Sequence, residues 1–296
     1  MHIRSVAYGE ILWDIIDGEP FLGGAPFNFA CHLARFGAQS YMISRVGRDV
    51  LGDRALAAAH THGVDTVFIQ RDDTLPTGTV PVVLHDGQPD YTILRPVAYD
   101  RIRYDEFRQV EEDTNFDVFY IGSLIQRDPV AAATLKSILE HADYTHVFYD
   151  VNLRKDCYTR EIVIDSLNVC TILKLNVDEV AILSQLVFEQ AYGNEAFAAR
   201  VADVYGIDVI IITAGDKGCL IHHHGNLTSV PGLSITLRDG IGAGDAFSAS
   251  FIYSYLQGRS VEDAAGIANQ IGAFVASQQG ALPEYPDDLI RLVTSV

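Results

Sequence analysis

The sequence predicts an α/β protein built on a mainly parallel sheet. Short runs of β-branched and aromatic residues alternate with longer helical patterns along the whole chain. The 296 residues are 48% hydrophobic and 20% charged, which is enough apolar material for a sizeable core. Glycines stand just past the ends of five predicted helices, where a left-handed residue is favoured: Gly37, Gly63, Gly206, Gly258 and Gly280.

The predicted strands are short and apolar, as expected of sheet strands that are buried on both faces. They cover residues 3–8, 40–46, 66–70, 117–122, 146–151, 171–175 and 208–213, and a hairpin follows at 219–227. The predicted helices cover residues 27–36, 51–62, 129–141, 177–185, 195–205, 246–257 and 261–278. The chain shows no linker, repeat or low-complexity run, so we expect one domain over residues 1–296.

Two segments, at about residues 11–22 and 72–98, interrupt this alternation. The first turns at Asp17-Gly18, and the second contains a hairpin pattern around Asp86-Gly87 that cannot belong to a parallel layer. Together they predict a small β-strand lid over the edge of the sheet where α/β proteins bind ligands. Because lid strands leave a free edge and an apolar face, we also expect a homodimer that pairs the two lids.

Charge and cysteine usage exclude several classes of protein. Lys plus Arg number 21 against 39 Asp plus Glu, and a net charge of −18 has the wrong sign for binding nucleic acid or an anionic membrane. The four cysteines contain no C-x-x-C pair, and no run approaches the ~18 apolar residues of a membrane helix. The N-terminus also lacks a secretion signal, so we expect a cytoplasmic protein with reduced cysteines.

The strongest chemical motif is the segment from Asp239 to Asp245, D-G-I-G-A-G-D, which precedes a long helical pattern. The backbone amides of Gly242, Ala243 and Gly244 would point at one spot beside the helix N-terminus and form an anion hole. Asp245 at its mouth suits a general base that takes a proton from a hydroxyl attacking a phosphoryl group. The alternative is an ordinary helix cap after a glycine-rich loop.

A second glycine pair opens an earlier helix, in Gly23-Gly24-Ala25-Pro26-Phe27-Asn28. The two glycines let a small ligand lie against bare backbone, and Asn28 can both donate to and accept from hydroxyls. The alternative is a tight turn with Pro26 at the first helical position.

These two motifs together resemble the ribokinase-like (pfkB) family of sugar kinases, and the G-G-A-P-x-N form is most similar to its fructokinase branch. Four more segments match family motifs in the expected order: Val46–Gly52, Asp150–Arg154, Asn176–Glu179 and Thr213–Gly218. Six ordered motifs over essentially the whole chain are far more specific than one. The resemblance implies a three-layer αβα fold with a mainly parallel central sheet and a small β-strand lid.

The resemblance implies an ATP-dependent kinase that transfers the γ-phosphoryl of MgATP to a primary hydroxyl of a small sugar, with fructose as the first choice. Asp245 would be the base, and the amides of Gly242–Gly244 would hold the transferred phosphoryl. Asp14, Gly24 and Asn28 would bind sugar hydroxyls, beside the bare backbone of Gly23. Arg95 and Arg154 are further substrate candidates because guanidinium groups clamp hydroxyls or phosphates, although each could equally form a surface ion pair.

On the nucleotide side, the resemblance implies that Asn176 and Glu179 act through water on Mg²⁺ and the phosphates. Their spacing also fits a capping box. Thr213, Gly215 and Gly218 would line the nucleotide, or simply form a hairpin turn. Lys174 and Asn269 resemble further nucleotide-side positions, with a solvated surface role as the alternative for both.

One residue departs from the family pattern D-T-x-G-A-G-D, because Gly240 stands where the threonine is usual. In the family this loop shapes a monovalent-cation site. Asp239 is kept, so K⁺ binding there stays a hypothesis, to be abandoned if activity is the same when a bulky organic cation replaces K⁺.

Other substrates and classes stay open at this stage. Within the fold, 2-keto-3-deoxygluconate, ribose or a nucleoside could be the acceptor. A catalytically silent sugar or nucleotide sensor would be expected to lack the base, whereas Asp245 is present. A nicotinamide dehydrogenase is disfavoured because the G-x-G element lies near residue 242 and not after the first strand.

Overall fold

One large sheet runs through the computed structural model of the chain, which describes residues 2–85, 88–108 and 115–295. In the described residues its strand order is β14-β13-β12-β11-β10-β9-β1-β4-β5, with β6 also paired to β4. The pairs among β1, β4, β5, β6 and β9–β12 are parallel, and the β12–β13 and β13–β14 pairs are antiparallel, so β13 alone of the described strands of this sheet is reversed. The bounds are β1 Arg4–Tyr8, β4 Gln39–Gly47, β5 Val64–Asp65, β6 Ile69–Asp72, β9 Asn115–Gly122, β10 Asp143–Asp150, β11 Ile172–Asn176, β12 Val209–Thr213, β13 Gly218–His223 and β14 Asn226–Pro231.

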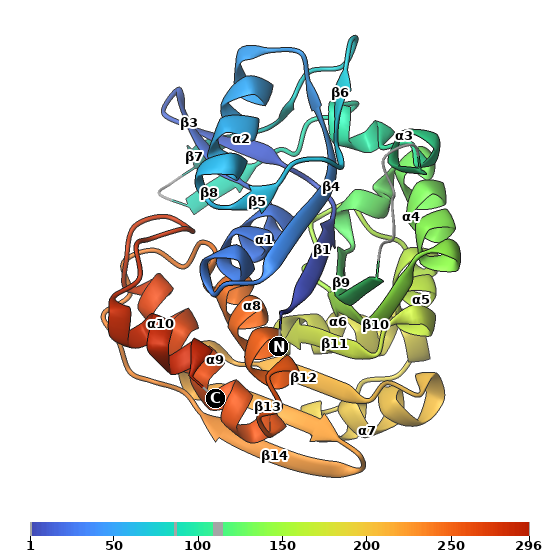
Figure 1. Cartoon of the computed structure of the whole chain (residues 1–296). Helices are drawn as coiled ribbons and strands as arrows, with labels where there is room; N and C mark the ends of the chain where they lie inside the picture. The colour runs from blue at the N-terminus through green and yellow to red at the C-terminus, as the bar shows by residue number, and fades with distance from the viewer. Residues whose placement is uncertain (1, 86–87, 109–114, 296) are drawn as a thin grey trace.

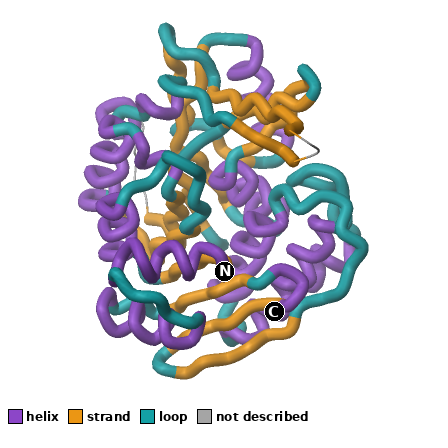
Figure 2. Tube along the Cα trace, turned by 180° about the vertical axis from the view of Figure 1, so that it is seen from behind, coloured by secondary structure: helices purple, strands orange, loops and turns teal. Residues whose placement is uncertain are grey.

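Helices cover both faces of this sheet and give three layers (Figures 1 and 2). One face packs against α1 Ala25–Arg35, α2 Val50–Thr61, α8 Ala243–Leu256, α9 Val261–Ala276 and α10 Asp287–Thr294. The other packs against α3 Tyr104–Arg108, α4 Pro129–His141, α5 Arg160–Val169, α6 Val177–Phe188 and α7 Asn194–Tyr205. Successive strand residues point to opposite faces, so Tyr120 joins the first core and Phe119 and Ile121 the second. The predicted αβα architecture is confirmed.

A second, four-stranded sheet has the order β3-β2-β7-β8 and lies at one end of the molecule (Figure 1). Its strands are β2 Leu12–Ile16, β3 Glu19–Gly23, β7 Gly78–His85 and β8 Gln88–Tyr91. Asp17 and Gly18 have φ of 51° and 82°, as a tight hairpin turn requires. The predicted turn at Asp86-Gly87 lies outside the described residues. Both interrupting segments thus supply strands to one small sheet, as predicted.

One predicted strand, at residues 66–70, is wrong in its first half. The chain instead forms β5 before it and β6 from Ile69, with a turn between them. Asp65 Oδ1 accepts from the Val67 amide at 3.0 Å, and the Ile69 amide donates to Thr66 O at 2.9 Å, so these backbone groups are used inside the turn. Helices α3, α5 and α10 were not predicted at all.

The carboxyl ends of the parallel strands meet at one edge of the sheet and set the site. Gly122 of β9 pairs with Asp150 of β10, and Asp150 pairs with Lys174 of β11. Asn176, at the end of β11, pairs with Thr213 at the end of β12. Three of the motif segments, Asp150–Arg154, Asn176–Glu179 and Thr213–Gly218, therefore reach the same edge.

None of the helices in the described residues combines the length and the apolar character needed to span a membrane. All four cysteines are free and buried.

Candidate active site

The N-termini of α1 and α8 meet at the centre of the site. Asn28 Nδ2 donates to Asp245 Oδ2 at 2.8 Å, which joins two motifs 217 residues apart. Each helix starts at a glycine that no other residue could replace without strain. Gly24 has φ 115° and a Cβ there would lie 2.5 Å from Glu10 O, while Gly242 has φ 76° and a Cβ would lie 2.4 Å from Ala281 Cβ.

Asp245 is the third residue of α8, next to the backbone amides that open the helix. The first-turn N–H groups of a helix have no intrahelical acceptor, so they are free to bind an anion. Burial raises the pKa of Asp245 to about 6, and the nearby Asp150 carboxylate adds to the rise. The Asn28 hydrogen bond and the charges of Lys174 and Arg154 oppose it. A carboxylate with this pKa is ionised near neutral pH yet basic enough to accept a proton.

Glu10 is a site residue that the sequence reasoning missed. It lies two residues after the end of β1 and is 4% exposed. Burial raises its pKa to about 7, with Arg154 lowering it and Asp245 raising it. Asp14, on β2, also has a pKa raised by burial and lowered by Arg154. The Gly9-Glu10 pair that follows the apolar first strand was the available signal for Glu10. The charge of Arg154 therefore acts on three site carboxylates, which favours a place in the site over a surface ion pair.

Lys174 is 7% exposed, so the alternative of a solvated surface role is wrong for this residue. Its Nζ lies 3.0 and 2.9 Å from the two oxygens of Asp150, and Ser248 Oγ donates to Asp150 Oδ2 at 3.0 Å. Burial lowers the pKa of Lys174, but the Asp150 carboxylate outweighs that effect and raises it overall. A Cβ on Gly244 would lie 3.4 Å from Lys174 Nζ, so the ammonium group sits beside the anion hole.

Asn176 and Glu179 form the capping box that was the alternative reading of their spacing. Asn176 Oδ1 accepts from the amides of Asp178 and Glu179, each at 2.9 Å, and Glu179 Oε2 accepts from the Asn176 amide at 2.9 Å. Glu179 Oε1 accepts from the Leu153 amide at 2.8 Å. Burial raises the pKa of Glu179. Each of its oxygens keeps a second lone pair, so the residue also fits an outer-sphere role toward a hydrated cation.

The other nucleotide-side candidates lie around the start of β13. Gly218 has φ 93°, and a Cβ there would lie 2.1 Å from Val230 O, so the turn requires glycine. Gly215 opens the short turn after Thr213, with φ 60°. Asn269 Nδ2 donates to Pro231 O at 3.0 Å, which fixes α9 to the end of β14 and contradicts a purely solvated role.

Asp239 links the anion-hole loop to the loop after α9. Its Oδ1 accepts from the Ile241 amide at 3.0 Å and its Oδ2 from the Gly280 amide at 3.1 Å. In the described part of the chain, no three His, Cys, Asp or Glu side chains are arranged to hold a metal ion. Both carboxylate oxygens of Asp239 thus accept from backbone amides, and K⁺ binding at this loop stays a hypothesis.

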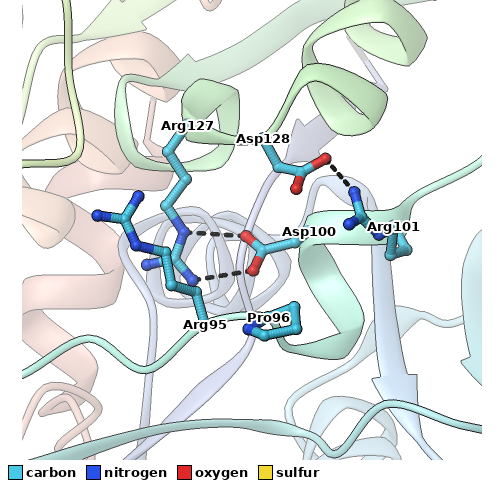
Figure 3. A pocket seen from close by; sticks show the side chains of 6 residues that line it. All are labelled: Arg95, Pro96, Asp100, Arg101, Arg127 and Asp128. Atoms are coloured by element: carbon cyan, nitrogen blue, oxygen red, sulfur yellow. Dashed lines mark hydrogen bonds and ion pairs between the residues drawn. The ribbon is translucent and has the colours of Figure 1, made fainter.

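Arg95 lies in a cavity of about 300 Å³ beside the lid (Figure 3). The cavity is lined by Arg95, Pro96, Asp100, Arg101, Arg127 and Asp128. Arg127 binds both oxygens of Asp100 at 2.9 and 3.1 Å, and Arg101 pairs with Asp128. Arg95 forms no ion pair with any described residue, so this cavity carries one uncompensated positive charge.

The fold is the ribokinase-like α/β fold. A solved sugar kinase of Pyrococcus horikoshii matches it with a TM-score of 0.80 at 26% identity, covering 94% of this chain and 93% of that one. A fructokinase of Vibrio cholerae matches with a TM-score of 0.82, covering 94% of each chain, and at 21% identity that is a likeness of fold alone.

The pfkB family carbohydrate kinase model matches residues 7–288, so the chain belongs to that family. By sequence it is 28% identical over 292 residues to the Pyrococcus horikoshii sugar kinase, covering 94% of this chain and 87% of that protein. It is 27% identical over 302 residues to a fructokinase of Escherichia coli, covering 97% of each. The resemblance inferred from the motifs is confirmed.

Proposed function

We propose that this carbohydrate kinase transfers the γ-phosphoryl of MgATP to a primary hydroxyl of a small sugar, with fructose as the first candidate. The observation that carries the proposal is the Asn28–Asp245 hydrogen bond, which brings the first glycine motif to a carboxylate inside the anion hole. Fructokinases among the relatives support the acceptor. The Pyrococcus horikoshii relative has been solved in complex with ATP, which supports the donor.

In this mechanism Asp245 accepts the proton of the sugar hydroxyl as its oxygen forms a bond to the γ-phosphorus. The bond from that phosphorus to the β–γ bridging oxygen breaks, and ADP leaves with the electron pair. The amides of Gly242, Ala243 and Gly244 stabilise the equatorial oxygens of the transferred group. The Lys174 ammonium group, beside Gly244, adds positive charge there.

Mg²⁺ enters as part of the nucleotide substrate and keeps several of its waters. Asn176 and Glu179 would contact those waters, while Thr213, Gly215, Gly218 and Asn269 would line the nucleotide. Asp239 stays a proposed neighbour of K⁺.

The small sheet acts as a lid over the acceptor. Its closure would exclude water, which otherwise competes with the sugar for the phosphoryl group. Asp14 comes from the lid strand β2, and Gly23, Gly24, Asn28 and Arg154 would complete the sugar site. The exposed edge strand β3 carries Phe21, 49% exposed, so we also propose pairing of two lids in a homodimer. Sedimentation velocity tests this pairing, with a dimer expected for the native chain and a monomer for Phe21→Asp.

A second acceptor class is favoured by one observation, the uncompensated Arg95 in its cavity. A guanidinium group without an internal carboxylate partner suits a sugar acid such as 2-keto-3-deoxygluconate. Arg95→Gln should then raise KM for the sugar acid at least tenfold and leave KM for fructose unchanged. Arg48→Gln, at an exposed surface ion pair, is the control and should change neither.

The first experiment is MgATP turnover against fructose, ribose, 2-keto-3-deoxygluconate, tagatose and adenosine, with Asp245→Asn beside the native chain. Asp263→Asn is a matched control because Asp263 is the third residue of α9 and lies outside the site. Sugar-dependent ADP release that only Asp245→Asn abolishes supports the base and identifies the acceptor. Binding of ATP or sugar without turnover would instead favour the sensor.

A further inference from the structure

Arg127 is a buried arginine that the proposed mechanism does not use. It ends the short helix η2 Leu124–Arg127, just before α4, and its side chain is 2% exposed. Its Nε and Nη2 donate to the two carboxylate oxygens of Asp100 at 2.9 and 3.1 Å (Figure 3). Because each charge has its partner, this pair needs no ligand.

The same guanidinium group also reaches two segments that carry acceptor candidates. Its Nη2 donates to the carbonyl oxygen of Leu94, the residue before Arg95, at 2.7 Å. Its Nη1 donates to Cys157 Sγ at 3.8 Å. The Cys157 amide in turn donates to Arg154 O at 2.8 Å. Arg127 therefore lies between the segment with Arg95 and the segment with Arg154, and bonds to both.

The lid contacts both of these neighbours of the site. The Lys155 ammonium donates to the carbonyl oxygen of Tyr91, the last residue of β8, at 3.1 Å, and lies 4.7 Å from the centre of its ring. The Arg127 guanidinium lies 5.1 Å from the centre of the Tyr99 ring. A Cβ on Gly78, the first residue of β7, would lie 2.4 Å from Cε1 of that ring. Arg127 is thus the buried part of a contact region between the lid and the loop after β10.

These contacts require the shape of a guanidinium group. An arginine carries its donors in a rigid planar fork, whereas a lysine carries all of its donors on one atom. A lysine at position 127 can pair with Asp100, but it cannot also reach Leu94 O and Cys157 Sγ. Arg127→Lys therefore keeps the charge pair and removes the link between the two segments.

We propose that Arg127 is a positioning residue for the acceptor, which holds the backbones that carry Arg95 and Arg154 in a fixed arrangement. Arg95 is exposed and long, so its head group loses many rotamers when it binds a sugar. A fixed backbone lowers that cost because it limits where the head group can go. The inference rests on the proposed function, in which both arginines contact the acceptor.

Arg127→Lys tests this through the Michaelis constants, measured with fructose and with 2-keto-3-deoxygluconate. KM should rise about tenfold for the sugar that is turned over, while kcat and KM for MgATP change less than about twofold. Arg45→Lys is the matched control, because Arg45 also forms a buried pair, with Asp72. Its other partners, Gln70 and Glu106, lie outside the site. Both variants should have a lower melting temperature, and an equal rise of the acceptor KM in both would overturn the inference.

Thiol labelling gives a readout that needs no acceptor. All four cysteines are buried, and Cys157 loses its contact with Arg127 in Arg127→Lys. Cys157 should then react with dithiobisnitrobenzoate about tenfold faster than in the native chain or in Arg45→Lys. Adding Cys157→Ser to Arg127→Lys should remove the faster reaction. An unchanged rate would overturn the inference, because the loop after β10 would then be held without Arg127.

If Arg127→Lys does not fold, Cys157→Ala removes one of the same contacts and keeps the Asp100 pair. It should raise the acceptor KM about threefold, with an unchanged KM for MgATP. An unchanged acceptor KM in Cys157→Ala would overturn the inference.

Arg154→Gln separates this inference from the proposed function. A raised acceptor KM in Arg154→Gln but not in Arg127→Lys would overturn the role of Arg127 and leave the proposed acceptor site standing. An unchanged acceptor KM in Arg154→Gln, with faster labelling of Cys157 in Arg127→Lys, would overturn the proposed acceptor role of Arg154 and leave the Arg127 link standing.

Discussion

The starts of α8 and α6 place a carboxylate at the same helical position and use it in opposite ways. Asp245 and Glu179 are each the third residue of their helix, at the carboxyl edge of the sheet. Both carboxylate oxygens of Glu179 accept hydrogen bonds, from the backbone amides of Asn176 and Leu153. The Asn176 side chain in turn caps the helix by accepting from the Glu179 amide. The residue before α8 is Gly242, which has no side chain to cap with.

The residue at the helix cap decides whether the first-turn amides of the helix are bonded within the protein or open to a ligand. With an asparagine at the cap, the acidic residue completes a closed ring of hydrogen bonds and becomes part of the fold. With a glycine there, the helix amides stay open to a ligand, and the acidic residue keeps an oxygen for a proton. Burial raises the pKa of both carboxyl groups, so burial alone does not separate structure from catalysis.

The largest expected effect is on kcat, when the proposed base Asp245 is replaced. Asp245→Asn should lower kcat by about 10³–10⁴-fold because it removes the proton acceptor while keeping a group that can bond to Asn28. Glu179→Gln should lower kcat far less and act mainly on KM for MgATP. Steady-state kinetics on both variants decide this, and equal losses in kcat would show that the two carboxylates share one role.

The next effect concerns the ion pair that lies beside Asp245. Lys174→Met leaves the Asp150 carboxylate buried without its cation, so the free energy of unfolding should fall by about 3–5 kcal/mol. Urea denaturation at pH 7 measures it. Arg200→Met removes the exposed pair with Asp203 and should change the same quantity by less than about 1 kcal/mol. A similarly small loss at Lys174 would mean that water reaches Asp150.

Stability against pH should report on the Asp245 carboxyl, because folding raises its pKa. The folded state raises the pKa of Asp245 to about 6, so wild-type stability is lost as the pH rises from about 4 through 6. Asp245→Asn has no such loss and should be more stable than wild type at pH 8 by up to about 3 kcal/mol, with no difference near pH 4. Denaturation at the two pH values checks this, and a destabilised variant at pH 8 would contradict it.

The smallest effect is at the capping box. Glu179→Gln puts an amide NH₂ where one of two backbone amides needs an acceptor, so it should destabilise the fold by about 1–3 kcal/mol at pH 8. This is opposite in sign to Asp245→Asn at the same pH. Asp178→Asn, one residue earlier and exposed, is the control and should change stability little. A neutral Glu179→Gln would show that the ring of hydrogen bonds is dispensable.

Much of the fold could be predicted because it depends on local patterns. Apolar runs and helical periods located the sheet strands and most helices, and glycines after helices marked their ends. Residues 66–70 were misplaced because a side-chain bond from Asp65 turns the backbone there, which an apolar pattern does not reveal. Helix α5 was missed, and only its buried face against the sheet shows why it forms.

For the site, sequence motifs identified Asp245, Asn28 and the glycines, because their residue types are tied to a backbone conformation or a chemistry. They did not identify Glu10, and they left Lys174 and Arg154 open between surface and site. Each of those outcomes depends on what lies opposite in space: Asp150 for Lys174, and three carboxylates for Arg154.

The sequence by itself determined the strand–helix alternation, the glycines that open α1 and α8, and the family to which the chain belongs. These follow from short-range sterics and periodicity, which neighbouring residues fully specify. Only the tertiary structure decided which charges are buried and which neighbours they have, because burial and electrostatic interaction depend on distances between residues far apart in the chain. That is why one third-position carboxylate closes a capping box and the other has its pKa raised to about 6 beside Asn28.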